Sequence, residues 1–149
     1  MEATAPLKSP AAALTRDEMT VWGERLGASL QLPVIVAILG EIGTGKTTLI
    51  QSICRGYGVR EQVTSPTFAL VHEYGGRKGK VFHVDLYRLR GASDLTNIGW
   101  DDIINSGSVV LVEWPERAQH RLPQDAIRIE LAYVEEDENR RLLKVDKPW

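Results

Sequence analysis

A glycine-rich motif that directly follows a short apolar run is the feature that most constrains this chain. The run, residues 34–39, is apolar throughout, as expected of a strand buried on both faces in a largely parallel sheet. Residues 40–47, with the sequence GEIGTGKT, match the phosphate-binding pattern G-x-x-x-x-G-K-[ST] at every fixed position. Apolar residues at helical spacing come next, whereas a glycine-rich turn with an accidental lysine would lack this context. The sequence therefore predicts a strand, a phosphate-binding loop and a helix in succession.

Each type of residue in this motif has a chemical role toward a nucleoside triphosphate and Mg²⁺. Glycines let the backbone bend so that successive N–H groups point into one concavity, and the following helix presents its positive end to the same anion. Lys46 supplies a cation to the β- and γ-phosphates, and the Thr47 hydroxyl is placed to bind Mg²⁺. The expected nucleotide-binding residues of the loop are Gly40, Ile42, Gly43, Thr44, Gly45, Lys46, Thr47 and Thr48.

Two carboxylates compete for the role of the second acid beside the Mg²⁺, which P-loop proteins place after a buried strand. Asp85 ends the strand-like segment 81–85, and Glu113 follows the apolar run 109–112. The second segment is apolar throughout, as a central parallel strand should be, whereas the first alternates partly and carries His83. The pattern favours Glu113 as the metal-binding acid and leaves Asp85 as the alternative. We expect His83 to be a hydrogen-bonded structural residue rather than a catalytic base.

The remaining pattern predicts an α/β fold with a single P-loop NTPase-type domain. We expect a twisted mixed sheet, parallel at its centre and antiparallel toward one edge, with helices on its faces. The first helix begins with a capping box at Thr15 and Glu18 and ends near Leu30. Further elements are expected as a hairpin of strands at 68–74 and 81–85, a helical segment at 93–104, and strands at 126–134 and 140–145 around an acidic turn at 135–139.

Length and composition restrict the domain organisation and the possible partners. The 149 residues fit one domain over 14–149 after a loose Ala- and Pro-rich tail over 1–13, which has no apolar signal-peptide core. No run approaches the roughly 18 apolar residues of a membrane span. The single Cys54 fits a reducing, cytoplasmic compartment. The net charge of −2, with no clustered basic face, indicates that any contact with RNA runs through a partner.

Four blocks of sequence make the chain similar to the TsaE (YjeE) family, the P-loop ATPases of bacterial tRNA threonylcarbamoyladenosine biosynthesis. A P-loop alone is shared by many families, but the combination of these blocks in this order is far more selective. The blocks are 40–48 (GEIGTGKTT), 64–68 (TSPTF), 83–89 (HVDLYRL) and 112–116 (VEWPE).

The resemblance implies a role for several residues. In that family ATP and Mg²⁺ are bound, and the metal is held by the residues that match Thr47 and Glu113. The aspartate that matches Asp85 is implicated in ATP turnover, so Asp85 and Lys46 are the expected catalytic residues. Family members act with TsaD and TsaB as an accessory component of N6-threonylcarbamoyladenosine (t6A37) formation. ATP binding favours docking onto that pair, hydrolysis resets it, and tRNA is reached only through the partners.

The chain departs from the family pattern at two places. Residues 92–97 replace a Glu-rich segment, which affects expected surface contacts but not the nucleotide site. A late Gly-Arg pair that approaches the nucleotide appears here as Asn139 and Arg140, so Arg140 is carried over as a nucleotide contact. Residues around Thr15 and Arg16 are expected near the adenine.

Three alternatives remain open at this stage. The segment 64–68 is either a sensor of the γ-phosphate, like a GTPase switch, or a plain turn before a strand. A small P-loop kinase acting on a metabolite is the second possible function, although such enzymes carry several lid arginines and only Arg88 and Arg90 form a close pair here. A nucleotide-gated scaffold with negligible turnover is the third reading.

Overall fold

A single seven-stranded sheet organises the chain in the computed structural model, which describes residues 11–64 and 70–146. The strand order is β1-β7-β6-β2-β5-β4-β3. The strands are β1 (Ala11–Thr15), β2 (Val34–Leu39), β3 (Val71–Gly75), β4 (Lys80–Asp85), β5 (Val109–Glu113), β6 (Ile127–Val134) and β7 (Asp137–Val145). The helices are α1 (Arg16–Ser29), α2 (Lys46–Gly56), α3 (Ala92–Asn97), α4 (Trp100–Ile104) and the 3₁₀ segment η1 (Pro115–Arg121).

The centre of the sheet is parallel, as the sequence predicts. Strand β2 pairs in parallel with both β5 and β6, and β4 pairs in parallel with β5. The hairpin of β3 and β4 is antiparallel, as expected. Antiparallel pairing also occurs at the other edge, where β7 joins β6 and β1 joins β7. The predicted antiparallel edge portion is therefore confirmed, and the structure has one at each edge of the sheet.

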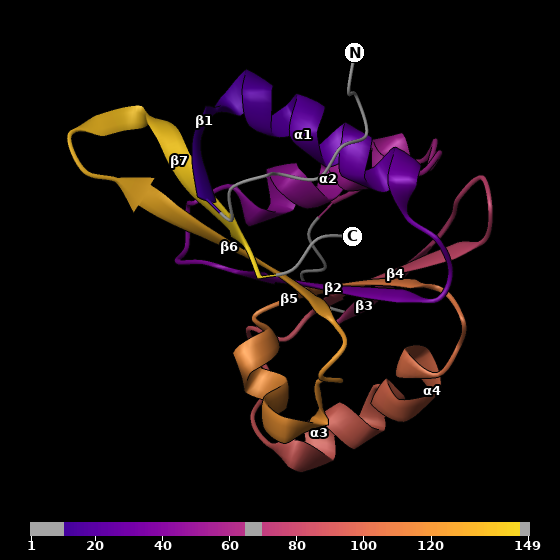
Figure 1. Cartoon of the computed structure of the whole chain (residues 1–149). Helices are drawn as coiled ribbons and strands as arrows, with labels where there is room; N and C mark the ends of the chain where they lie inside the picture. Colours follow the sequence, from indigo (N-terminus) through magenta and orange to yellow (C-terminus); the bar gives the residue numbers. More distant parts are fainter. Residues whose placement is uncertain (1–10, 65–69, 147–149) are drawn as a thin grey trace.

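Helices cover both faces of the sheet, which confirms the predicted α/β class (Figure 1). Helices α1 and α2 lie on one face, and α3, α4 and η1 lie on the other. Each layer buries its own apolar cluster, with Leu26 and Ile50 fully buried on the first side and Trp100 and Leu86 on the second. None of the helices in the described part of the chain is long and apolar enough to cross a bilayer.

Glycine residues allow helices α1 and α2 to pack closely against each other. A Cβ atom at Gly27 of α1 would lie 2.0 Å from the carbonyl oxygen of Ile53 in α2. A Cβ at Gly56 of α2 would lie equally close, at 2.0 Å, to the carbonyl oxygen of Glu24. The two backbones are therefore in direct contact, and α1 fixes the position of the helix that begins at the P-loop.

The N-terminal boundary differs from the expected tail. Residues 11–13, assigned to the tail from the sequence, belong to β1, where Ala11 pairs with Lys144 and Ala13 with Leu142. Pairing with β7 satisfies backbone groups that would otherwise need water, and an alanine run carries no alternation that would reveal this. The capping box that follows is confirmed: the Glu18 N–H donates to Thr15 Oγ1 at 3.2 Å, and the Thr15 N–H donates to Glu18 Oε1 at 2.9 Å.

Two further elements differ from the expectation in their limits. The helical segment expected over 93–104 is split into α3 and α4, because Gly99 adopts a left-handed conformation with φ of 78°. The acidic turn expected over 135–139 is shorter, since β6 ends at Val134 and β7 begins at Asp137. Strand β3 begins at Val71, whereas the sequence predicts a strand from residue 68. Residues 65–69, which include the start of that predicted strand and most of the 64–68 segment, lie outside the described part of the chain.

Candidate nucleotide-binding site

The P-loop joins the end of β2 to the start of α2, as the sequence predicts. Gly45 precedes the helix with φ of 101°, a left-handed conformation that glycine adopts without strain. Among the residues that the structure describes, no side chain caps the first turn of α2. Because the first N–H groups of a helix have no carbonyl partner within it, they are available to an anion at this position.

Lys46 is buried at the first position of α2. Its ammonium donates to the Gly40 carbonyl and, at 3.2 Å, to the Glu41 carbonyl, and it lies 4.0 Å from the centre of the Trp114 ring. Burial lowers the pKa of Lys46, and the Glu113 carboxylate is the leading opposing influence. Trp114 follows β5 directly in a left-handed conformation, with φ of 57°, and this turn brings its ring over the lysine.

Thr47 and Glu113 meet beside the P-loop, although 66 positions separate them in sequence. Their Oγ1 and Oε1 atoms are 3.5 Å apart, long for a hydrogen bond but close enough for two ligands of one ion. The second oxygen of Glu113 lies 2.6 Å from Nε2 of His83, and both side chains are buried. The histidine therefore fixes the orientation of the carboxylate.

A hydroxyl and a carboxylate oxygen suit Mg²⁺, which binds hard oxygen ligands and keeps several waters. Across residues 11–64 and 70–146, no group of three or more His, Cys, Asp or Glu side chains could form a cage of protein ligands. The donor set thus fits a divalent ion that is bound partly by this pair and partly by other oxygen atoms.

Asp85 lies beside Glu113 because the two residues pair in register on β4 and β5. Its Oδ1 accepts from the N–H of Tyr87 at 3.0 Å, and its side chain is half-buried. Lys46, Thr47, Asp85 and Glu113 all line one cavity of about 490 Å³. The other lining residues are Ile42, Gly43, Gly45, Thr48, Leu70, Tyr87, Arg88 and Trp114.

A second cavity of about 370 Å³ lies on another side of the P-loop. It is lined by Leu14, Arg16 and Met19 from β1 and α1, and by Glu138, Asn139 and Arg141 from β7, together with loop residues. Gly43, Gly45 and Thr48 line both cavities, and Thr44 lines the second alone. The P-loop residues thus adjoin two spaces, and Arg16, expected near the adenine, lines the second.

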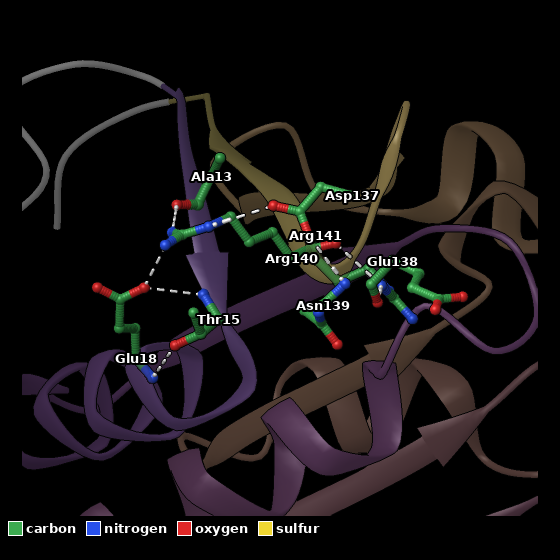
Figure 2. A network of polar contacts seen from close by, with 8 residues as sticks. All are labelled: Ala13, Thr15, Glu18, Asp137, Glu138, Asn139, Arg140 and Arg141. Carbon is green, nitrogen blue, oxygen red and sulfur yellow. Dashed lines mark hydrogen bonds and ion pairs between the residues drawn. The ribbon is translucent and has the colours of Figure 1, made fainter.

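Arg140, expected to contact the nucleotide, lines neither of these cavities. Figure 2 shows its guanidinium bridging β1, α1 and β7, with distances of 3.2 Å to the Ala13 carbonyl, 3.3 Å to Glu18 and 3.4 Å to Asp137. These contacts hold the start of α1 against the β6–β7 hairpin. Arg140 thereby supports a wall of the second cavity rather than forming it.

Arg141 lines the second cavity instead, and the sequence reasoning missed it. Its Nη1 donates to the carbonyls of Glu138 and Arg140, each at 2.9 Å. Its guanidinium lies 4.8 Å from the ring centre of Tyr133, whose hydroxyl donates to the Ile42 carbonyl of the P-loop at 2.7 Å. Alternation along a strand, which sends adjacent side chains to opposite faces, is the signal that could have separated the two arginines.

Comparison with known proteins identifies the family. The sequence model described as "Threonylcarbamoyl adenosine biosynthesis protein TsaE" matches residues 14–142. The chain belongs to the TsaE family. Two relatives carry the name tRNA threonylcarbamoyladenosine biosynthesis protein TsaE. The one from Haemophilus influenzae is 36% identical over 74% of this chain and 70% of its own length, and that from Treponema pallidum is 35% identical over 81% and 88%.

A third relative agrees with this assignment, and a solved structure shares the fold. The protein of the same name from Streptomyces coelicolor is 40% identical over 73% of this chain and 75% of its own length. The crystal structure of YdiB from Bacillus subtilis superposes with a TM-score of 0.72 at 24% identity, covering 91% of this chain and 83% of that one. At that identity the superposition supports the fold alone.

Proposed function

We propose that this chain is a Mg²⁺-dependent ATPase that serves as an accessory component of t6A37 formation in tRNA. One observation carries the proposal: the Thr47 hydroxyl and the Glu113 carboxylate meet at the P-loop, in the cavity that Lys46 and Asp85 also line. These are the groups that bind a metal–triphosphate complex in P-loop enzymes. The names of the relatives support the pathway.

The proposed role of each residue in the site follows from its position. When bound, Mg²⁺ neutralises charge on the β- and γ-phosphates, and Thr47 and Glu113 are the residues that would hold it. Lys46 exchanges its two loop carbonyls for phosphate oxygens, a small movement because both acceptors belong to the same loop. Asp85, half-buried in the cavity wall, orients the attacking water.

The product of the cycle is a change in partner affinity. We infer that ATP favours association with a TsaD-like and TsaB-like pair in the cytoplasm, that hydrolysis releases it, and that tRNA is contacted only through those partners. The segment 64–68 is proposed as the sensor, since it connects the P-loop helix to the hairpin that carries Asp85. Thr67→Ala should then reduce the difference in partner affinity between the ATP and ADP states more than it reduces ATP binding.

Nucleotide binding and single-turnover hydrolysis test the assignment of the site. Lys46→Ala should lower ATP affinity or turnover by about tenfold or more, equivalent to about 1.4 kcal/mol. Glu113→Ala should weaken Mg²⁺-dependent binding, and Asp85→Ala should lose turnover while keeping much of its ATP binding. Unchanged binding and hydrolysis in Lys46→Ala would refute the nucleotide site, and the opposite pattern for the two acids would exchange their roles.

Titration of TsaD and TsaB with ATP, ADP and a non-hydrolysable ATP analogue tests the gating. Affinity should be highest with ATP or the analogue and lower with ADP. Equal affinity in the three states would refute nucleotide-gated docking and would favour a metabolite kinase. Docking controlled by ATP without measurable turnover would favour a nucleotide-gated scaffold.

A further inference from the structure

We propose that Arg88 is a further catalytic residue, which neutralises the charge that develops on the γ-phosphoryl group during ATP hydrolysis. This inference rests on the proposed ATPase function. It gives a cation of the chain itself the role that an arginine finger, from the same chain or from a partner, has in GTPases.

The placement of Arg88 is the first observation. Its side chain lines the 490 Å³ cavity together with Thr47, Asp85 and Glu113. Among the described residues that line this cavity, Arg88 and Lys46 carry the two cationic side chains, and Asp85 and Glu113 carry the two carboxylates. MgATP brings further negative charge into this space, so Lys46 alone would leave the carboxylates and the phosphates with an excess of negative charge.

The backbone that carries Arg88 is anchored at the metal-binding strand. The N–H of Leu86 donates to the carbonyl of Glu113 at 3.1 Å, and the N–H of Leu89 closes a turn onto the Leu86 carbonyl at 3.0 Å. Both leucine side chains are buried, so each end of the turn is held by the core. Tyr87, between them, donates its N–H to Asp85. The backbone from which the Arg88 side chain extends is therefore held in place beside both carboxylates.

The reaction shows where such a cation acts. The oxygen of water forms a bond to the γ-phosphorus, and the bond from that phosphorus to the β,γ-bridging oxygen breaks. The electron pair of the broken bond remains on the ADP β-phosphate, and the proton of the water leaves with inorganic phosphate or to solvent. Charge therefore grows on the bridging and γ-oxygens, which a planar guanidinium can contact through two N–H groups at once.

Two substitutions of Arg88 and one matched control test this role in the full-length chain. Arg88→Ala should lower the single-turnover rate at saturating ATP by about 100-fold or more, while ATP and ADP affinities stay within about threefold of wild type. Arg88→Lys should recover only a small part, because an ammonium lacks the planar pair of donors. Arg90→Ala is the control, since Arg90 is an exposed arginine on the same connection and lines neither cavity.

Binding of ADP with fluoroaluminate, which imitates the transferring phosphoryl group, separates catalysis from a structural role. Arg88→Ala should lose most of this affinity, and added guanidinium ion should restore part of its turnover. Wild-type turnover in Arg88→Ala would overturn the proposal, and so would an equal loss of ATP, ADP and fluoroaluminate binding. In either case the ATPase assignment stands if Lys46→Ala loses activity. Absence of hydrolysis by the wild-type chain would overturn both.

Discussion

Replacing Gly27 with alanine tests how closely α1 holds the P-loop helix. The added Cβ would lie 2.0 Å from the Ile53 carbonyl oxygen and 2.9 Å from the Tyr57 nitrogen. Both are backbone atoms of α2 or its cap, so no side-chain rotation relieves the overlap. Overpacking of this kind costs about 3 kcal/mol at its upper end, and alanine regains about 1 kcal/mol of helix propensity. We therefore expect a net loss of about 2 kcal/mol in the free energy of unfolding.

Urea unfolding measures this loss, and Ala28→Gly provides a matched control on the exposed side of the same helix. The control should cost about 0.5–1 kcal/mol, which is the propensity difference alone. The melting temperature of Gly27→Ala should fall by about 4–8 °C. ATP affinity should fall with it, because α2 carries Lys46 and Thr47. If Gly27→Ala is more stable than wild type, the gain in helix propensity outweighs any steric overlap, and the close backbone contact is refuted.

The remaining predictions concern His83, Arg140, Arg141 and Cys54. His83→Leu should weaken Mg²⁺-dependent ATP binding by about 10- to 100-fold, because the Glu113 carboxylate loses its partner at 2.6 Å. Titrations with Mg²⁺ measure this loss, and Mg²⁺-independent ADP binding should change little. Arg140→Ala should lower the free energy of unfolding by at most about 1 kcal/mol, because its ion pairs are partly exposed. Arg141→Ala should mainly lower ATP affinity, because Arg141 lines the second cavity. The opposite result would support Arg140 as the nucleotide contact. Burial raises the pKa of Cys54 to about 12 from 9.0, so a thiol reagent should label it near neutral pH only after unfolding. The unfolded chain releases this proton first, so the cysteine's contribution to stability should decline as pH rises from about 9 toward about 12 in denaturant titrations.

Local sequence was enough to predict the P-loop because its residues are consecutive. The meeting of Thr47 with Glu113 was also predictable in outline, since the carboxyl ends of neighbouring parallel strands share one edge of a sheet. His83 was expected to be a hydrogen-bonded structural residue, and its 2.6 Å contact with Glu113 agrees with that expectation.

The features that were missed depend on contacts between distant segments. Residues 11–13 form a strand because they pair with the edge of β7, and an alanine run contains no pattern that predicts this pairing. The break between α3 and α4 at Gly99 could have been suspected, but a glycine within a helical pattern does not by itself require a left-handed turn. Which of Arg140 and Arg141 lines the second cavity is a matter of strand register, which a one-residue uncertainty inverts. The nucleotide contact of Arg140 stays a prediction.

The different surroundings of Asp85 and Glu113 give a physical reason for dividing their roles. They are register partners on neighbouring strands, so the backbone places both at the same edge. Glu113 is only 3% exposed, and both its oxygens contact other side chains, Thr47 and His83, which suits a ligand that must keep one orientation. Asp85 is half-buried in the wall of the cavity, where a water molecule can reach it. A carboxylate that orients a water molecule for attack must be accessible to water. A carboxylate that holds a metal ion keeps its orientation better when it is buried and hydrogen-bonded.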